Sequence, residues 1–262
     1  MNFTRRFIAT AAAAAALAAS AGLSTAALAA TPAAAAQPSV VIVHGAFADG
    51  SDWAKVIPLL QREGVQVTAV QNPLSSLADD VAAARRAIDA QPGKVVLVGH
   101  SWGGTVITEA GNSDKVASLV YVAAFAPDVG QNTAEQGKGF PAPSGFAHIK
   151  PDAQGWLSLT AEGMKNHFAQ DLPPAATAVM TATQGPIQAK AFDQTVSAAA
   201  WKNKPSYYLL ATADHMIDPE AQASMAKRAG AKVTKVDSSH VPQQSKPEAV
   251  AKVILDAVRQ SR

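Results

Sequence analysis

The sequence contains no cysteine, and only 16% of its residues are charged and 6% aromatic. Without thiols the chain cannot form a disulfide scaffold, a thiolate zinc site or an iron–sulfur cluster, and it cannot use a cysteine nucleophile. The 22 basic residues exceed the 20 acidic ones by two, a balance too even to indicate nucleic-acid binding. Hydrophobic residues make up 48% of the chain, which excludes an intrinsically disordered protein.

The N-terminus has the order of an export signal. Arg5 and Arg6 precede an apolar run over residues 7–21, and small residues follow through Ala30. This order predicts a secretory signal peptide over residues 1–30. The run is too short and too rich in alanine for a membrane span of about 20 residues, so we expect no stable membrane anchor.

The end of this signal is expected at Ala27-Leu28-Ala29, with Ala30 as an alternative. The arginine pair is also typical of twin-arginine signals, and the sequence leaves the export route open. A linker over residues 31–37 and one domain over residues 38–262 would follow. We therefore expect a periplasmic or secreted protein, whose oligomeric state the sequence does not indicate.

Short β-branched runs alternate with segments of helical periodicity along this domain. The predicted strands are Ser39–His44, Val65–Val70, Lys94–Val98, Val116–Val122, Ser206–Leu210 and Lys232–Val236. The predicted helices are Asp52–Glu63, Leu77–Ala90, Thr105–Ala110, Glu220–Ala229 and Glu248–Val258. This alternation predicts an α/β fold with a doubly wound, mostly parallel sheet.

One long stretch, residues 127–205, interrupts the alternation. It is rich in Gly, Pro, Ala and Gln, shows no convincing strand, and has helical patches at residues 161–170 and 174–183. We expect it to be an inserted, mostly helical cap over the carboxyl edge of the sheet.

A candidate nucleophile, Ser101, lies in the pattern G-x-S-x-G formed by residues 99–103. The pattern follows a predicted strand and opens a predicted helix, which is the context that a nucleophile elbow requires. Side chains at Gly99 or Gly103 would collide with neighbouring groups at such a corner. The helix N-terminus behind Ser101 would favour developing negative charge.

A serine that transfers acyl groups also needs two donors for the oxyanion. One would be the backbone N–H of Trp102. The other should come from the loop that follows the strand at Ser39–His44, where Ala46 is the first choice and Phe47 the alternative.

The base must be one of six histidines. Only His240, beyond the last predicted strand, completes the chain order of serine, acid and histidine. The acid should follow the strand Ser206–Leu210, where Asp214 lies. Asp218 competes with it, but its place before Pro219 is explained by helix capping. Asp214 would hold one tautomer of His240 and stabilise its imidazolium form.

These motifs resemble the α/β-hydrolase superfamily over residues 38–262. They are Val43-His44-Gly45-Ala46-Phe47, Gly99-His100-Ser101-Trp102-Gly103-Gly104, Ala211-Thr212-Ala213-Asp214 and Ser239-His240. More narrowly, they resemble small esterases related to plant methylesterases and hydroxynitrile lyases, and their bacterial relatives. The resemblance implies a Ser101–His240–Asp214 triad with an oxyanion hole at Ala46 and Trp102, and no metal or cofactor.

The same resemblance argues against two other activities. The lyases have Thr where Gly45 stands and Lys where Val241 stands, so a cyanohydrin lyase is not expected. A dehalogenase or an epoxide hydrolase would have Asp at position 101.

Aromatic residues are candidates for a substrate pocket, and of these Phe47 and Trp201 are the substrate-binding residues that we expect. Trp102 would narrow the site or add an aromatic wall. The wider set of candidates is Phe47, Trp102, Phe125, Trp156, Phe168 and Trp201.

The sequence thus predicts an exported serine carboxylesterase for small or medium esters with an apolar part. Two alternatives stay open: an acyltransferase or perhydrolase with the same triad, and a receptor-like ligand-binding module with negligible turnover.

Overall fold

The computed structural model describes residues 37–261. The predicted signal peptide, its cleavage site and all but the last residue of the predicted linker lie outside the described residues. Within residues 37–261, no helix has the length and hydropathy that crossing a bilayer requires.

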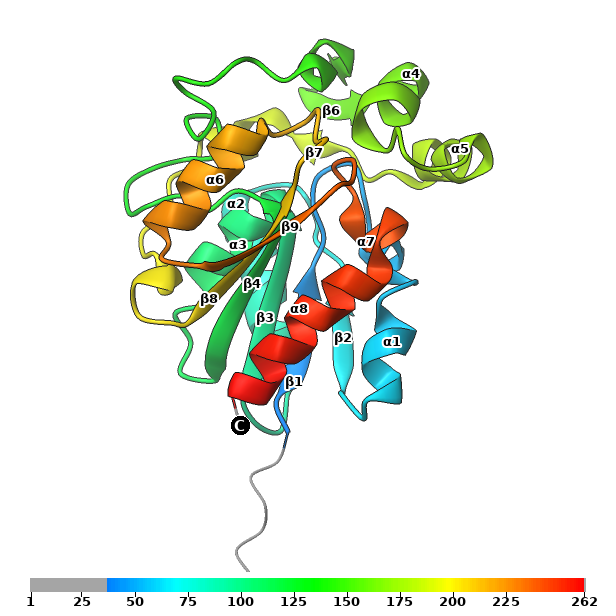
Figure 1. The fold of residues 1–262 in the computed structure, drawn as a ribbon. Coiled ribbons are helices and arrows are strands. Elements are labelled where there is room, and N and C mark those ends of the chain that lie inside the picture. Colours follow the sequence, from blue (N-terminus) through cyan, green and yellow to red (C-terminus); the bar gives the residue numbers. More distant parts are fainter. Residues whose placement is uncertain (1–36, 262) are drawn as a thin grey trace, which may run out of the picture. The chain divides into compact units, whose positions relative to one another are not determined.

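The described part of the chain is built on a six-stranded parallel sheet of order β2-β1-β3-β4-β8-β9 (Figure 1). The strands are β1 (Ser39–Val43), β2 (Val67–Val70), β3 (Val95–Ser101), β4 (Val116–Ala124), β8 (Ser206–Ala211) and β9 (Lys232–Val236). All six predicted strands are present and the predicted fold class is confirmed. In a parallel sheet every carboxyl end lies at the same edge, so the loops that carry Ala46, Ser101, Asp214 and His240 meet there.

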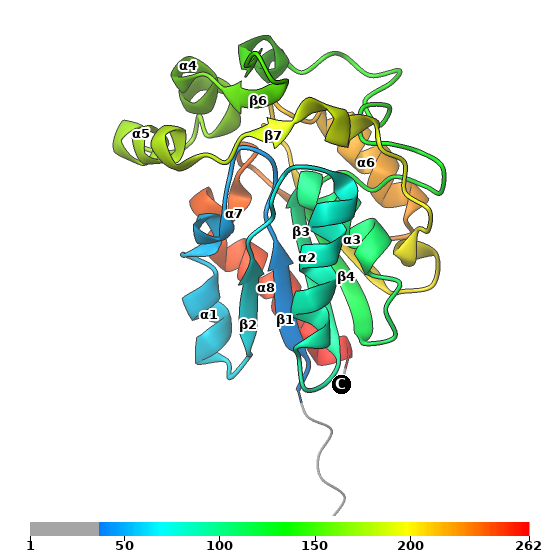
Figure 2. The same cartoon turned by 180° about the vertical axis from the view of Figure 1, so that it is seen from behind.

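Helices cover both faces of the sheet (Figures 1 and 2). Val40 and Ile42 of β1 pack toward α1 (Ile57–Arg62) and α8 (Pro247–Gln260), whereas Val41 and Val43 pack toward α2 (Leu77–Asp89) and α3 (Trp102–Ala110). This alternation explains why β1 reads as an unbroken apolar run. The helices outside the cap are η1 (Gly50–Trp53), α1 (Ile57–Arg62), α2 (Leu77–Asp89), α3 (Trp102–Ala110), α6 (Pro219–Arg228), α7 (Pro242–Ser245) and α8 (Pro247–Gln260).

The predicted helix Asp52–Glu63 is broken into the 3₁₀ turn η1 and the helix α1. Pro58 explains the break, because it lies in the first turn of α1, where its missing N–H and fixed φ are tolerated. In a continuous helix the same proline would stand in the interior. The 3₁₀ turn η1 carries Asp52, which contacts residues next to the candidate active site.

The insertion between β4 and β8 lies over the carboxyl edge of the sheet (Figure 1). The expectation of no strand in it was wrong, because β5 (Ile149–Pro151), β6 (Trp156–Leu159) and β7 (Ile187–Gln188) form a small antiparallel sheet. These strands are only three, four and two residues long, too short to show a period of two. The elements are η2 (Ser144–His148), β5 (Ile149–Pro151), β6 (Trp156–Leu159), α4 (Ala161–Gly163), η3 (Met164–Phe168), α5 (Pro174–Thr183), β7 (Ile187–Gln188), η4 (Ala189–Asp193) and η5 (Ala200–Lys202).

Candidate active site

Ser101 stands at a sharp corner between β3 and α3. Its φ of 51° lies in the left-handed region, which is strained for a residue with a side chain. Two glycines make the corner possible. A Cβ at Gly99 would come within 2.5 Å of the Gly103 carbonyl oxygen, and one at Gly103 would run into the carbonyl oxygen of Val43. The strand, corner and helix that the motif requires are therefore present.

Asp214 and His240 are in direct contact. Asp214 follows β8, His240 follows β9, and His240 Nδ1 lies 2.7 Å from Asp214 Oδ2. Both residues are almost fully buried, at 4% and 1% exposure. Asp218, the competing acid, instead caps α6 by accepting the N–H groups of Glu220 and Ala221 at 2.8 and 3.2 Å. Helix capping therefore explains the presence of an aspartate at position 218.

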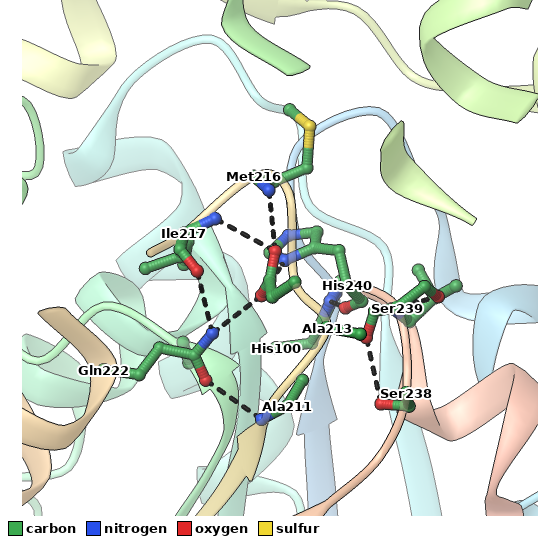
Figure 3. A network of polar contacts seen from close by, with 12 residues as sticks. His100, Ala211, Ala213, Met216, Ile217, Gln222, Ser238, Ser239 and His240 are labelled. Atoms are coloured by element: carbon green, nitrogen blue, oxygen red, sulfur yellow. Dashed lines mark hydrogen bonds and ion pairs between the residues drawn. The ribbon is translucent and has the colours of Figure 1, made fainter. Parts of the chain in front are cut away.

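Four donors hold the Asp214 carboxylate, and the residues that supply them are labelled in Figure 3. Oδ1 accepts the backbone N–H groups of Met216 and Ile217 at 2.7 and 3.0 Å. Oδ2 accepts Gln222 Nε2 at 2.8 Å in addition to His240 Nδ1. This number of donors compensates the desolvation of a buried charge. Sequence reasoning missed Gln222, whose only signal is a glutamine among alanines in the first turns of α6.

A second buried group fixes the backbone of His240. The ring of His100 donates from Nε2 to the His240 carbonyl oxygen at 2.8 Å, and the two rings are 4.8 Å apart. Burial lowers the pKa of His100 well below 6.5, and the ring of His240 lowers it further. His100 is thus a neutral donor in the packing behind the elbow.

Asp52 fixes the segment that follows His240 in the chain, the short helix α7. Its carboxylate accepts Gln243 Nε2 at 2.5 Å and Gln244 Nε2 at 3.0 Å, and both glutamines belong to α7. Burial raises the pKa of Asp52. Sequence reasoning also missed this residue, because its partners are about 190 positions away.

The structure distinguishes between the backbone N–H groups that are candidates for the oxyanion hole. Trp102 is the first residue of α3, so its N–H has no acceptor within that helix. In the loop after β1, the N–H of Phe47 donates to the carbonyl oxygen of Gly185 at 3.2 Å. Within residues 37–261, no hydrogen bond engages the N–H of Ala46. Ala46 therefore remains available as a donor, and Phe47 does not.

The indole of Trp102 does not form a wall of the site, contrary to expectation. It is fully buried beneath the elbow, 5.3 Å from the ring of Phe192, and its Nε1 donates to Asp80 Oδ2 at 2.7 Å. Asp80 also accepts the N–H of Leu74 at 2.8 Å. Burial raises the pKa of Asp80 to about 6, although these hydrogen bonds oppose the rise.

This raised pKa predicts a pH dependence of stability. Between about pH 4 and pH 6 the folded state keeps the Asp80 proton while the unfolded state loses it, so stability falls as pH rises. The free energy of unfolding of Asp80→Asn relative to wild type should increase by about 3 kcal/mol from about pH 4 to pH 7. Urea denaturation at several pH values measures it. Asp89→Asn, exposed on the same helix, is the control, and an Asp80→Asn difference independent of pH would contradict the prediction.

A cavity of about 390 Å³ opens above the elbow, and both Ser101 and His240 lie in its wall. The other residues of the cavity wall come from the cap and from the loops at the carboxyl edge of the sheet, and most of them are apolar. Among the described residues that line it, Asp218 is the one carboxylate, and there is no Lys or Arg. Six phenylalanines contribute to the wall: Phe47, Phe125, Phe140, Phe146, Phe168 and Phe192.

The expected pocket residues divide into two groups. Phe47, Phe125 and Phe168 line the cavity, and Phe168 also packs edge-on against His240 with ring centroids 5.0 Å apart. Trp156 and Trp201 are not part of the wall, so the structure does not bring Trp201 to the site. Trp201 instead donates from Nε1 to the Pro127 carbonyl oxygen at 3.0 Å and anchors one end of the cap.

Comparison with known proteins agrees with this architecture. Residues 40–253 match the model of the alpha/beta hydrolase family. Over 84% of the chain and 98% of the relative, the sequence is 28% identical to a probable hydrolase, R7, of a Phoma species. It is 25% identical to the pyrethroid hydrolase of Sphingobium wenxiniae over 83% of the chain and 86% of the relative. The crystal structure of a methylesterase from Arabidopsis superposes with a TM-score of 0.70 at 23% identity, covering 85% of this chain and 99% of that one.

The parallel sheet, the serine elbow and the buried acid–histidine pair define a hydrolase of the α/β class. The family match extends over most of the chain, and the chain belongs to the alpha/beta hydrolase family.

Proposed function

We propose that this protein is an exported serine carboxylesterase that acts through an acyl-enzyme on Ser101. One observation carries the proposal: the Asp214–His240 pair is formed at 2.7 Å, and His240 opens to the same cavity as Ser101. Because Nδ1 of His240 is engaged by Asp214, Nε2 is the ring nitrogen left to receive a proton. This arrangement has the roles of a serine hydrolase triad.

In the first half of the reaction, His240 Nε2 takes the proton of Ser101 as Oγ attacks the ester carbonyl carbon. The N–H groups of Ala46 and Trp102 stabilise the oxyanion of the tetrahedral intermediate. The intermediate collapses by breaking the bond to the alcohol oxygen, and the His240 proton goes to that oxygen. The alcohol leaves and the acyl group remains on Ser101.

In the second half, His240 removes a proton from water, which attacks the acyl carbon. Collapse of the second tetrahedral intermediate breaks the bond to Oγ, and His240 returns the proton to Ser101. Asp214 stays ionised throughout and stabilises the imidazolium each time it forms. No other group is required to balance either half.

The cavity wall supports uncharged esters with an apolar part as substrates. Six phenylalanine rings favour aromatic or aliphatic groups, and none of the described residues that line the cavity is a Lys or Arg that could bind a carboxylate or phosphate. Two relatives, named as a pyrethroid hydrolase and a methylesterase, point to ester hydrolysis. The N-terminal pattern of residues 1–30 supports export.

A panel of chromogenic esters tests this proposal on protein purified from the periplasm. We expect kcat/KM to be at least about 10-fold higher for neutral apolar esters than for size-matched esters carrying a carboxylate, because Asp218 and the apolar wall disfavour an anion. Equal rates for the matched pair would contradict the substrate class. Faster transfer to an added alcohol or peroxide than to water would identify an acyltransferase or perhydrolase. Mass spectrometry of the same preparation tests export, since an exported chain should begin after residue 29 or 30.

A further inference from the structure

Gln222 is a fully buried polar side chain that the proposed reaction does not use directly. It lies in the second turn of α6 and is 0% exposed. Its Nε2 donates to Asp214 Oδ2 at 2.8 Å and to the Ile217 carbonyl oxygen at 3.0 Å, and its Oε1 accepts the N–H of Ala211 at 3.2 Å. All of its polar atoms are therefore engaged, as Figure 3 shows.

These contacts fix which end of the amide faces the acid. An amide turned by 180° would place its oxygen against the Ile217 carbonyl oxygen and the Asp214 carboxylate, and its NH₂ group against the N–H of Ala211. All three contacts would then be repulsive. The donor end of Gln222 is thus held toward Asp214 by the end of β8 and by the loop that carries the acid.

The choice of carboxylate oxygen matters for the chemistry. Gln222 donates to Oδ2, which is the same oxygen that faces His240 Nδ1. A purely structural brace could equally have used Oδ1, which is instead occupied by two backbone N–H groups. A neutral donor on Oδ2 withdraws part of the negative charge that would otherwise act on the histidine ring.

We propose that Gln222 is a positioning residue of the active site, which orients the Asp214 carboxylate and sets the pH at which His240 becomes a base. This inference rests on the proposed function. Gln222 does not touch the substrate and acts only through Asp214. Removing its donor leaves Asp214 Oδ2 with a stronger negative charge toward the ring. The imidazolium form of His240 is then stabilised, and the ring loses its proton at a higher pH.

The test compares Gln222→Met with wild type by the pH profile of kcat/KM for a neutral ester. Methionine has a similar length and no donor. We expect the acid limb of the profile to move up by about 0.5–1 pH unit, because a lost donor to a carboxylate changes neighbouring pKa values by this order. At the optimum, kcat should fall about 10-fold with KM changed less than about 2-fold, because the loss concerns the chemical step.

Gln91→Met is the matched control, since Gln91 is also buried and donates through Nε2, but to Thr68 and Ala87 at the other end of the molecule. It should leave the acid limb in place. Gln222→Leu is a second variant in case the methionine variant does not fold. Leucine also lacks a donor for Asp214 Oδ2, so its acid limb should likewise move to higher pH.

An acid limb unmoved in a folded Gln222 variant would overturn the inference, even if kcat fell. That result would leave the proposed function intact as long as Ser101→Ala is inactive. If Ser101→Ala kept its activity, the proposed function itself would fail, and the acid limb could not be assigned to His240.

Discussion

Replacing Ser101 with alanine is expected to lower kcat/KM for a neutral ester by about 10⁴-fold or more. The loss removes the oxygen atom that forms the acyl-enzyme. A residual rate above that in water should persist, because the Ala46 and Trp102 N–H groups and the apolar cavity would still bind the ester and its oxyanion. The substitution also removes nothing that supports the fold, since the strained backbone at position 101 is held by β3, α3 and their glycines.

The measurement has two parts that should agree. Ester hydrolysis gives the rate, and labelling with a fluorophosphonate probe reports whether Ser101 is activated. Wild type should be labelled at Ser101 and the variant not at all. Ser118→Ala is a matched control, because Ser118 is also buried but lies near the start of β4, where its hydroxyl forms a hydrogen bond with that of Ser261. A Ser101→Ala enzyme with parental activity would exclude the acyl-enzyme mechanism, and an unlabelled wild type would revive the receptor-like alternative.

The parts of the fold that could be predicted from the sequence are those fixed by local pattern. A buried parallel strand such as β1 reads as an apolar run because both of its faces are covered. The elbow is readable because a serine at this corner needs glycine at positions 99 and 103. His240 could be selected because it follows the last predicted strand and completes the chain order of serine, acid and histidine.

The parts that could not be predicted depend on contacts between distant segments. Asp52 meets Gln243 across 191 positions, and nothing local distinguishes it from a solvated carboxylate. Trp102 was expected to narrow the site or to add an aromatic wall to it. Successive residues at a helix start point in different directions, and its indole instead turns inward to Asp80. The strands of the cap were missed because strands of two to four residues are too short to show a period.

Replacing Asp214 with asparagine is expected to lower kcat by about 10³–10⁴-fold without unfolding the protein. The hydrogen bonds around this side chain determine how asparagine would sit. Met216 and Ile217 both donate to Oδ1, so the single oxygen of asparagine should take that position. The NH₂ group then occupies the position of Oδ2, where it faces Gln222 Nε2 and His240 Nδ1. This orientation is the better one because a histidine can change tautomer to accept the NH₂ group, whereas the two backbone N–H groups at Oδ1 can only donate.

Facing an N–H donor, His240 Nδ1 must become the acceptor, and the proton of the neutral ring moves to Nε2. The ring would then donate toward Ser101 instead of accepting its proton, so the base is blocked even though the geometry is preserved. Asp218→Asn is the informative comparison, because asparagine is also a good helix cap and the loss of activity should stay below about 10-fold. Circular dichroism and thermal unfolding verify that both variants are folded. The kcat of each variant with a neutral ester then shows which aspartate the reaction requires. If Asp218→Asn lost more activity than Asp214→Asn, the acid of the site would have to be reassigned, because only the acid that bonds the ring can control its tautomer.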